Sequence, residues 1–242
     1  MATVILVRHG RTTANATGVL AGRSPGIRLD ERGAEQATAT GLRLAPVRLA
    51  ALVSSPLERC KQTAKAISSQ QTHGGRTSTE RGLSECDYGE WQGRALKDLA
   101  KEPLWKVVQS QPSAVVFPGG ESMRGMQDRA LEAVRRHDRL VQQEHGHDAV
   151  WLAVSHGDVI KAILADALGT HLDLFQRIQV DPASVSVVRY TPARPYVLGI
   201  NTTGGDLSWL TPAPSARKGR KKSGHDAALG GGAGPGTAGT SS

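Results

Sequence analysis

The chain has 242 residues, enough for one α/β domain with a substantial hydrophobic core. Hydrophobic residues make up 38% of it and charged residues 21%, and no apolar run approaches the roughly 18 residues that a membrane-spanning helix needs. The net charge is +8, but five of the 30 basic residues and one of the 22 acidic residues lie in the last 32 positions, so half of that excess belongs to the C-terminal segment. Charge therefore does not by itself indicate a nucleic-acid partner.

The first predicted element is a strand over Val4–Val7, a continuous apolar run typical of strands that are covered on both faces. The start of the chain lacks the basic region and the cleavage site of a signal peptide. The two cysteines, Cys60 and Cys86, are too few for a disulfide framework. We therefore expect a cytoplasmic protein.

A polar, glycine-containing loop follows and continues to about Arg28. Asp30 is a good N-cap for a helix over about 31–45, and the apolar run Leu49–Val53 predicts a second buried strand. The tetrapeptide Ser55-Pro56-Leu57-Glu58 then predicts a helix start, with a serine cap, a proline in the first turn and a glutamate that completes a capping box.

The second half of the chain begins with a weaker strand candidate, Ser78–Leu83. Residues 84–121 look irregular, with a helix at about 94–110 and a break at Pro118–Gly120. Apolar residues spaced by three, four or seven predict a long amphipathic helix over about 122–144. The remaining predicted elements are a strand at Ala149–Val154, a helix at Asp158–Leu168, and two strands at Val185–Tyr190 and Tyr196–Ile200.

Alternation of strands and helices predicts a three-layer α/β/α sandwich around a mostly parallel sheet of about six strands. The last two strands follow each other without a helix, so we expect one antiparallel edge strand. We assign residues 1–210 to one folded domain. Residues 211–242, first basic and then rich in glycine and alanine, are predicted to be a disordered tail.

The candidate functional side chains follow the predicted strands. In a parallel sheet the carboxyl ends of the strands meet at one edge, where ligands bind. His9 follows the first strand and His156 the strand at Ala149–Val154, while Arg59 lies one turn into the helix after the second strand. The planar guanidinium group of arginine and the free N–H groups at the start of a helix both bind phosphate well. The sequence therefore predicts a phosphoryl site that contains Arg8, Asn15, Arg59 and Gly157.

Physical chemistry also assigns roles within this group. Two flanking arginines, Arg8 and Arg59, disfavour protonation of His9, so His9 is expected to be neutral and nucleophilic near pH 7. His156 is expected to donate to the phosphoryl oxygens as charge shifts in the transition state. The leaving alkoxide needs a proton, and Glu85 is the candidate acid because a carboxyl near bound phosphate has a raised pKa.

Taken together, six segments resemble the histidine phosphatase (phosphoglycerate-mutase-like) superfamily. In family order they are Arg8-His9-Gly10 with Thr12 and Asn15; Leu29-Asp30-x-x-Gly33-x-x-Gln36-Ala37; Ser54-Ser55-Pro56-Leu57-x-Arg59-x-x-Gln62-Thr63-Ala64; Leu83-x-Glu85-x-x-Tyr88-Gly89-x-Trp91-x-Gly93; Pro118-Gly119-Gly120-Glu121-Ser122; and Val154-Ser155-His156-Gly157.

The resemblance covers about residues 3–202. It implies a catalytic domain with a small helical cap over the site, a phosphohistidine intermediate at His9, and Glu85 as the proton donor. It also implies that hydrolysis needs no metal and no bound organic cofactor. The family usually has an acidic residue after the first Arg-His-Gly, whereas this chain has Arg11. We take Arg11, Arg23 and Trp105 as candidates for the substrate entrance, although arginines in loops are usually solvated and tryptophans usually belong to the core.

The resemblance leaves two reactions open. The stretch Glu85–Gly93 is closer to phosphatase members than to mutases with a longer basic and aromatic region, so we favour a histidine acid-type phosphatase that acts on a small phosphorylated metabolite. The alternative is a phosphomutase, which would need 2,3-bisphosphoglycerate as a primer. A third, weaker alternative is a non-catalytic phosphate- or polyanion-binding protein that uses Arg217–Lys222.

Few other partners are expected. No membrane partner is predicted and nucleic acid is disfavoured, while a homodimer stays open. The two histidines of His145-Gly146-His147 could be metal ligands, but a third nearby ligand is lacking, so we interpret this segment as a solvated turn.

Overall fold

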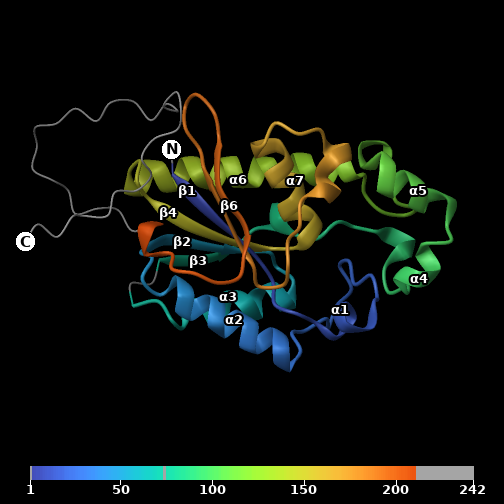
Figure 1. Cartoon of the computed structure of the whole chain (residues 1–242), viewed down its shortest axis with the longest axis horizontal. Helices are drawn as coiled ribbons and strands as arrows, with labels where there is room; N and C mark the ends of the chain where they lie inside the picture. Colours follow the sequence, from blue (N-terminus) through green and yellow to red (C-terminus); the bar gives the residue numbers. More distant parts are fainter. Residues whose placement is uncertain (1, 73–74, 211–242) are drawn as a thin grey trace, which may run out of the picture.

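The computed structural model describes residues 2–72 and 75–210, so the predicted tail at 211–242 lies outside the described residues. A six-stranded sheet in the order β3-β2-β4-β1-β5-β6 forms the middle of the molecule (Figure 1). Its strands are β1 Thr3–Arg8, β2 Leu49–Ser54, β3 Arg76–Thr79, β4 Val150–Ser155, β5 Val185–Arg189 and β6 Tyr196–Thr202.

The sheet confirms the predicted fold class. Strands β3, β2, β4 and β1 are parallel to one another, whereas β5 pairs antiparallel with both β1 and β6. The antiparallel strand is therefore β5, which lies next to the edge strand and not at the edge as expected. The edge strand is β6, which follows β5 in a hairpin. Because Arg8 lies opposite Ser155 in the β1–β4 register, the residues that follow these two strands leave the sheet side by side.

Helices cover both faces of the sheet. Helices α2 (Glu31–Leu44) and α3 (Glu58–Ser68) lie on one face, and α6 (Met123–His145) and α7 (Gly157–Ala167) lie on the other (Figure 1). Alternate residues of β1 supply the two cores: Val4 and Leu6 pack with α6 and α7, while Ile5 and Val7 pack with α2 and α3. Burial on both faces explains why this strand reads as a continuous apolar run.

Three short helices lie beyond the carboxyl ends of the parallel strands and form the predicted cap: α1 (Thr13–Thr17), α4 (Leu96–Leu99) and α5 (Pro103–Ser110) (Figure 1). Helix α1 lies in a stretch predicted as loop, where Thr12 and Asn15 form a capping box. The single helix predicted at 94–110 is divided in two, because Pro103 has no N–H to continue a helix and instead begins a new one.

Two predicted element boundaries were wrong. The strand expected at Ser78–Leu83 ends at Thr79, since the Glu80 side chain accepts a hydrogen bond from the Gly82 N–H (2.8 Å) and starts a 3₁₀ turn. Helix α3 begins at Glu58 without a side-chain cap. Ser55 lies before the N-cap residue Leu57, and its hydroxyl accepts a long hydrogen bond from the Leu57 N–H (3.4 Å) and a short one from a histidine of the site (2.8 Å).

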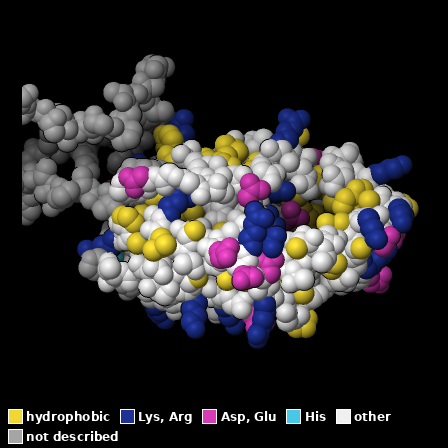
Figure 2. All heavy atoms as spheres, turned by 60° about the horizontal axis from the view of Figure 1, so that its bottom comes forward, with side chains coloured by type: hydrophobic (Ala, Val, Ile, Leu, Met, Phe, Trp, Pro, Cys, Tyr) yellow, Lys and Arg dark blue, Asp and Glu magenta, His cyan; other side chains and the backbone are white. Residues whose placement is uncertain are grey.

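No helix in residues 2–72 and 75–210 combines the length and hydrophobicity required to cross a membrane. On the face seen in Figure 2, basic side chains stand among acidic ones rather than forming a continuous positive field.

Candidate active site

The two histidines that follow β1 and β4 meet at the carboxyl edge of the sheet. The ring centroids of His9 and His156 lie 5.2 Å apart, with the rings inclined at 63°. His9 is 3% exposed and His156 is fully buried. This proximity was predicted from the parallel arrangement, because adjacent parallel strands end at the same edge of the sheet.

Arg59 lies between the two rings and is itself only 2% exposed. Its Nε donates to His9 Nε2 (3.2 Å), and its Nη2 donates both to His156 Nδ1 (3.1 Å) and to the carbonyl of Gly22 (2.8 Å). The first turn of α3 therefore places one guanidinium in contact with both predicted catalytic histidines.

Hydrogen bonds decide which nitrogen of His9 carries the proton. Nδ1 lies 2.7 Å from the Gly10 carbonyl oxygen, which can only accept, so the proton is on Nδ1 and the Nε2 lone pair faces Arg59. Burial, followed by the charges of Arg59 and Arg8, holds the pKa of His9 well below its ordinary value. His9 is thus a neutral imidazole whose unprotonated Nε2 accepts a hydrogen bond from Arg59, and an unprotonated Nε2 is what the predicted role of nucleophile requires.

His156 has the opposite arrangement. Arg59 can only donate, so His156 Nδ1 accepts, and the ring proton on Nε2 donates to Ser55 Oγ (2.8 Å). Burial, with the charge of Arg59 next, places the pKa of His156 well below its ordinary value. Donation from Nδ1 to a phosphoryl oxygen would therefore require the proton to move between the ring nitrogens or a second proton to bind. Ser55 was missed as a site residue, because Ser-Pro also reads as a helix start.

Glu85 lies on the same side as these rings, with its Oε2 3.9 Å from His156 Nδ1 and its Oε1 accepting from the Cys86 N–H (3.0 Å). Burial, with the negative charge of Asp158 as the next cause, raises the pKa of Glu85 to about 7. A large fraction of this carboxyl group is therefore protonated at neutral pH. That state suits the predicted proton donor.

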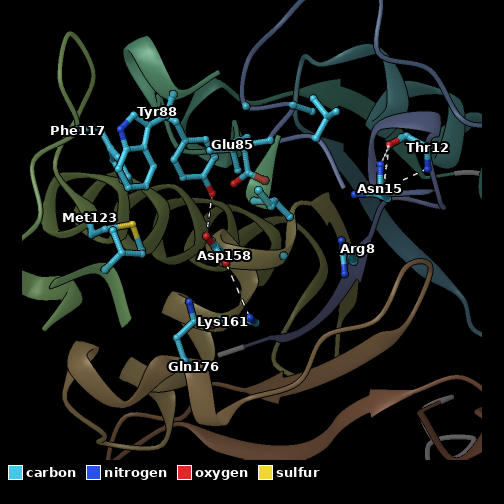
Figure 3. A pocket seen from close by; sticks show the side chains of 18 of the residues that line it. Arg8, Thr12, Asn15, Glu85, Tyr88, Phe117, Met123, Asp158, Lys161 and Gln176 are labelled. Carbon is cyan, nitrogen blue, oxygen red and sulfur yellow. Dashed lines mark hydrogen bonds and ion pairs between the residues drawn. The ribbon is translucent and has the colours of Figure 1, made fainter. Parts of the chain in front are cut away.

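Asp158 and Lys161, on α7, are pocket residues that the sequence interpretation missed. Tyr88 Oη donates to Asp158 Oδ2 (2.8 Å), and Asp158 Oδ1 lies 3.9 Å from Lys161 Nζ (Figure 3). A signal was available in the sequence, because Asp158 follows His156 by two positions at the start of a helix that was predicted to open onto the site.

The predicted phosphate-binding residues lie in the same region. Arg8 Nη1 donates to the Val180 carbonyl (2.7 Å), while its Nε is buried and has no hydrogen-bond partner among the described residues. This N–H lies beside Gly157, the first residue of α7, whose N-cap His156 makes no side-chain capping bond.

Asn15 is exposed, and its amide oxygen accepts from the Thr12 N–H and hydroxyl (3.1 and 2.9 Å), so its role in the described structure is to cap α1.

These groups surround one cavity of about 290 Å³. Its polar end contains Arg8, His9, Arg59, Glu85 and Gly157. Asn15 and Trp105 also line the cavity, whereas His156, which is bonded to Arg59, does not.

The two arginines predicted at the entrance do not line this cavity, because acidic residues distant in sequence bind them. Arg11 pairs with Asp30 (2.8 Å). Arg23 pairs with Glu121 (2.8 Å) and donates from Nε to the carbonyl oxygen of Glu85 (2.8 Å). Arg23 thus supports the main chain that carries the candidate acid.

Within residues 2–72 and 75–210, no group of three or more His, Cys, Asp or Glu side chains is arranged to hold a metal ion. His145 ends α6, and Gly146 follows it with a φ of 90°. The helix predicted over about 122–144 therefore includes His145, which was expected to lie in a turn.

Comparisons with known proteins agree with this geometry. The chain is 32% identical over 219 residues to the probable phosphoglycerate mutase GpmB of Salmonella typhi, which covers 88% of this chain and 97% of that protein. It is 31% identical over 212 residues to phosphoserine phosphatase 1 of Hydrogenobacter thermophilus, covering 84% and 93%. With three mycobacterial proteins the identity is 32%, but the match spans only 54% of their length.

The solved structure of Bacillus stearothermophilus YhfR superimposes with a TM-score of 0.74 at 27% identity, over 87% of this chain and all of that one. The model of the histidine phosphatase superfamily (branch 1) matches residues 4–203. The chain belongs to the histidine phosphatase superfamily.

Proposed function

We propose that this protein hydrolyses a small phosphomonoester through a phosphohistidine intermediate on His9. The observation that carries the proposal is the hydrogen bond between His9 Nδ1 and the Gly10 carbonyl, which leaves Nε2 unprotonated at the polar end of the cavity. In the described structure Nε2 accepts from Arg59 Nε, and attack on phosphorus takes the place of this hydrogen bond. Arg8 and Arg59 supply the positive charge that a phosphoryl group needs.

The reaction has two steps. In the first, His9 Nε2 attacks phosphorus and the bond to the ester oxygen breaks, while Glu85 gives its proton to the leaving alkoxide. In the second, the Glu85 carboxylate takes a proton from water, whose oxygen attacks phosphorus as the P–N bond breaks. Phosphate leaves, and His9 and protonated Glu85 are restored. A pKa of about 7 for Glu85 suits both directions of proton transfer.

Hydrolysis is favoured over mutase chemistry by the charge of the lining. A bisphosphorylated primer carries a second phosphate that needs a cationic group of its own. Besides Arg8 and Arg59, Lys161 is the cation among the described lining residues, and it lies 3.9 Å from Asp158. We therefore propose that turnover needs neither a primer nor another bound organic cofactor.

The test is phosphate release from a panel of phosphorylated metabolites, measured with and without 2,3-bisphosphoglycerate. Release that does not depend on the primer, is absent in His9→Ala and is retained in His145→Ala is the expected result. His145 is a matched control, because it lies at the far end of α6 and does not line the cavity. Primer-dependent phosphoryl transfer without phosphate release would instead establish a mutase.

A further inference from the structure

The cavity has a second half, with a chemistry unlike that of the phosphate end. Several apolar side chains line it, and we call six of them the apolar wall: Leu20, Trp91, Trp105, Val108, Phe117 and Met123. They come from the loop after α1, from the 3₁₀ turn Gly89–Trp91, from α5, and from the segment that leads into α6 and its first residue. They therefore surround the position of the group that is attached to the phosphate.

The apolar wall is built around packed aromatic rings. Trp91 and Trp105 are stacked with centroids 6.1 Å apart, and Phe117 meets the Trp91 ring at 65° with centroids 5.4 Å apart. Trp91 and Phe117 are buried, whereas Trp105 and Leu20 are only partly buried. The wall is thus rigid at its base and keeps apolar surface with which a ligand could pack.

The charges in this half of the cavity do not favour a substrate whose alcohol part carries a negative charge of its own. Lys161 Nζ donates to Gln176 Oε1 (2.9 Å) and lies 3.9 Å from Asp158 Oδ1, so its charge is already engaged (Figure 3). Arg11 and Arg23 are bound elsewhere and do not line the cavity. A carboxylate on the alcohol would therefore lose its hydration next to Asp158 and aromatic faces, without an uncommitted cation among the described lining residues.

On this basis, and resting on the proposed phosphatase function, we propose that the preferred substrate is the phosphate monoester of a compact, uncharged alcohol that carries an apolar ring. The ring packs against the apolar wall, with Trp105 as its main contact. A cavity of about 290 Å³ is at the small end of ligand pockets, which span roughly 300–1,000 Å³, and suits one ring rather than an extended chain.

Binding to the full-length His9→Ala variant tests this without turnover. We would measure the dissociation constants of benzyl phosphate, methyl phosphate and 3-phosphoglycerate by calorimetry at pH 7. Benzyl phosphate is expected to bind at least about tenfold tighter than either of the others, because burial of one ring stabilises the complex. Adding Trp105→Ala should remove most of that advantage and leave methyl phosphate binding within about twofold, whereas Leu168→Ala, an exposed site outside the lining, should change neither.

The proposal is wrong if 3-phosphoglycerate binds His9→Ala as tightly as benzyl phosphate does. It is equally wrong if Lys161→Met abolishes tight binding of 3-phosphoglycerate, since Lys161 would then recognise a second anion. The comparison of ligands on His9→Ala alone decides the matter if Trp105→Ala fails to fold. A wild-type chain that binds benzyl phosphate tightly but releases no phosphate from any ester would contradict the proposed function, and only the ligand preference of the cavity would then stand.

Discussion

At the scale of single residues, burial decides the protonation state of the site. His9 and His156 are kept neutral because burial removes the water that would stabilise an imidazolium, and the guanidinium of Arg59 adds to this effect. The same burial keeps a proton on Glu85 up to a pH of about 7. The opposite effects on the histidines and the carboxyl group provide a nucleophile and an acid at the same pH.

The role of Glu85 can be tested through the leaving group. Glu85→Gln should lower kcat/KM for an alkyl phosphate such as benzyl phosphate by about 10²–10⁴-fold, since the alkoxide then leaves without a proton. The loss should be much smaller for 4-nitrophenyl phosphate, because the 4-nitrophenolate ion is a stable leaving group. Equal losses for the two substrates, measured side by side, would show that Glu85 is not the acid.

Asp158 contributes to the raised pKa of Glu85, and its effect on the pH profile has a defined sign. With Glu85 as the proposed acid, kcat/KM should decline as pH rises through the pKa of Glu85. Asp158→Asn removes a neighbouring negative charge, lowers that pKa and moves the alkaline limb of the profile to lower pH. Asp166→Asn on the same helix, where the carboxylate pairs with Arg135, serves as the control and should leave the limb in place. An unchanged or upward-shifted limb in Asp158→Asn would refute this role.

At the scale of elements, a close approach of two backbones supports the nucleophile. Gly10 follows His9, and a Cβ at Gly33, in the first turn of α2, would lie 1.9 Å from the Arg11 carbonyl oxygen. The loop after β1 can therefore rest on α2 only because position 33 has no side chain.

Gly33→Ala should force this loop away from α2. We expect a loss of about 2 kcal/mol in the free energy of unfolding, as is usual for overpacking. A fall in kcat/KM of about 10²-fold should accompany it, because His9 would be displaced. Gly204→Ala, where a Cβ would meet no atom within 4 Å, is the control. Urea unfolding and a steady-state assay measure both effects, and a Gly33→Ala variant as stable and active as wild type would contradict the account.

Sequence reasoning predicted the elements that local signals define. The continuous apolar run of β1 and the Asp30 cap of α2 were confirmed, the latter by a 2.8 Å bond from the Gly33 N–H. The cap assigned to Ser55 was wrong because the hydroxyl bonds to His156, 101 positions away, and a distant tertiary contact leaves no local pattern.

The candidate site was predictable to a similar degree. His9 and Arg59 could be placed together, because strand ends and first helical turns in a parallel sheet face the same edge. Glu85 was assigned from the need for a proton donor and from the family resemblance, since it follows neither a strand end nor a helix start. The positions of Arg11 and Arg23 could not be predicted, since they depend on ion pairs with Asp30 and Glu121. The apolar wall depends on how the cap folds over the sheet, which periodicity does not show.

At the scale of the whole molecule, the buried histidines should make stability depend on pH. Unfolded histidine takes up a proton near pH 6.5, while His9 and His156 in the folded protein resist protonation to well below that value. Their contribution to stability is therefore present above pH 6.5 and is lost as pH falls towards their folded pKa values. The raised pKa of Glu85 has the opposite effect. Its contribution to stability is present below pH 4.5, the ordinary pKa of a glutamate, and is lost as pH rises through about 7.

Replacing one buried histidine isolates its share of this dependence. Between pH 6.5 and 5 each such group adds at most about 1.4 kcal/mol per pH unit to the slope of the unfolding free energy. His156→Gln should therefore show a shallower decline than wild type in urea titrations across this range. His145→Ala, which removes an exposed histidine, should keep the wild-type slope. A His156→Gln slope as steep as that of wild type would contradict the burial argument.

The central claim is that phosphorus becomes bonded to His9, and trapping the intermediate tests it most directly. The full chain would be mixed with a ³²P-labelled phosphomonoester, quenched within milliseconds in alkali, and examined for protein-bound label. We predict label that is stable to base, labile to acid and located on the peptide that contains His9, and none in His9→Ala. Label that persists in His9→Ala, or turnover by wild type with no acid-labile label at any time, would contradict the account.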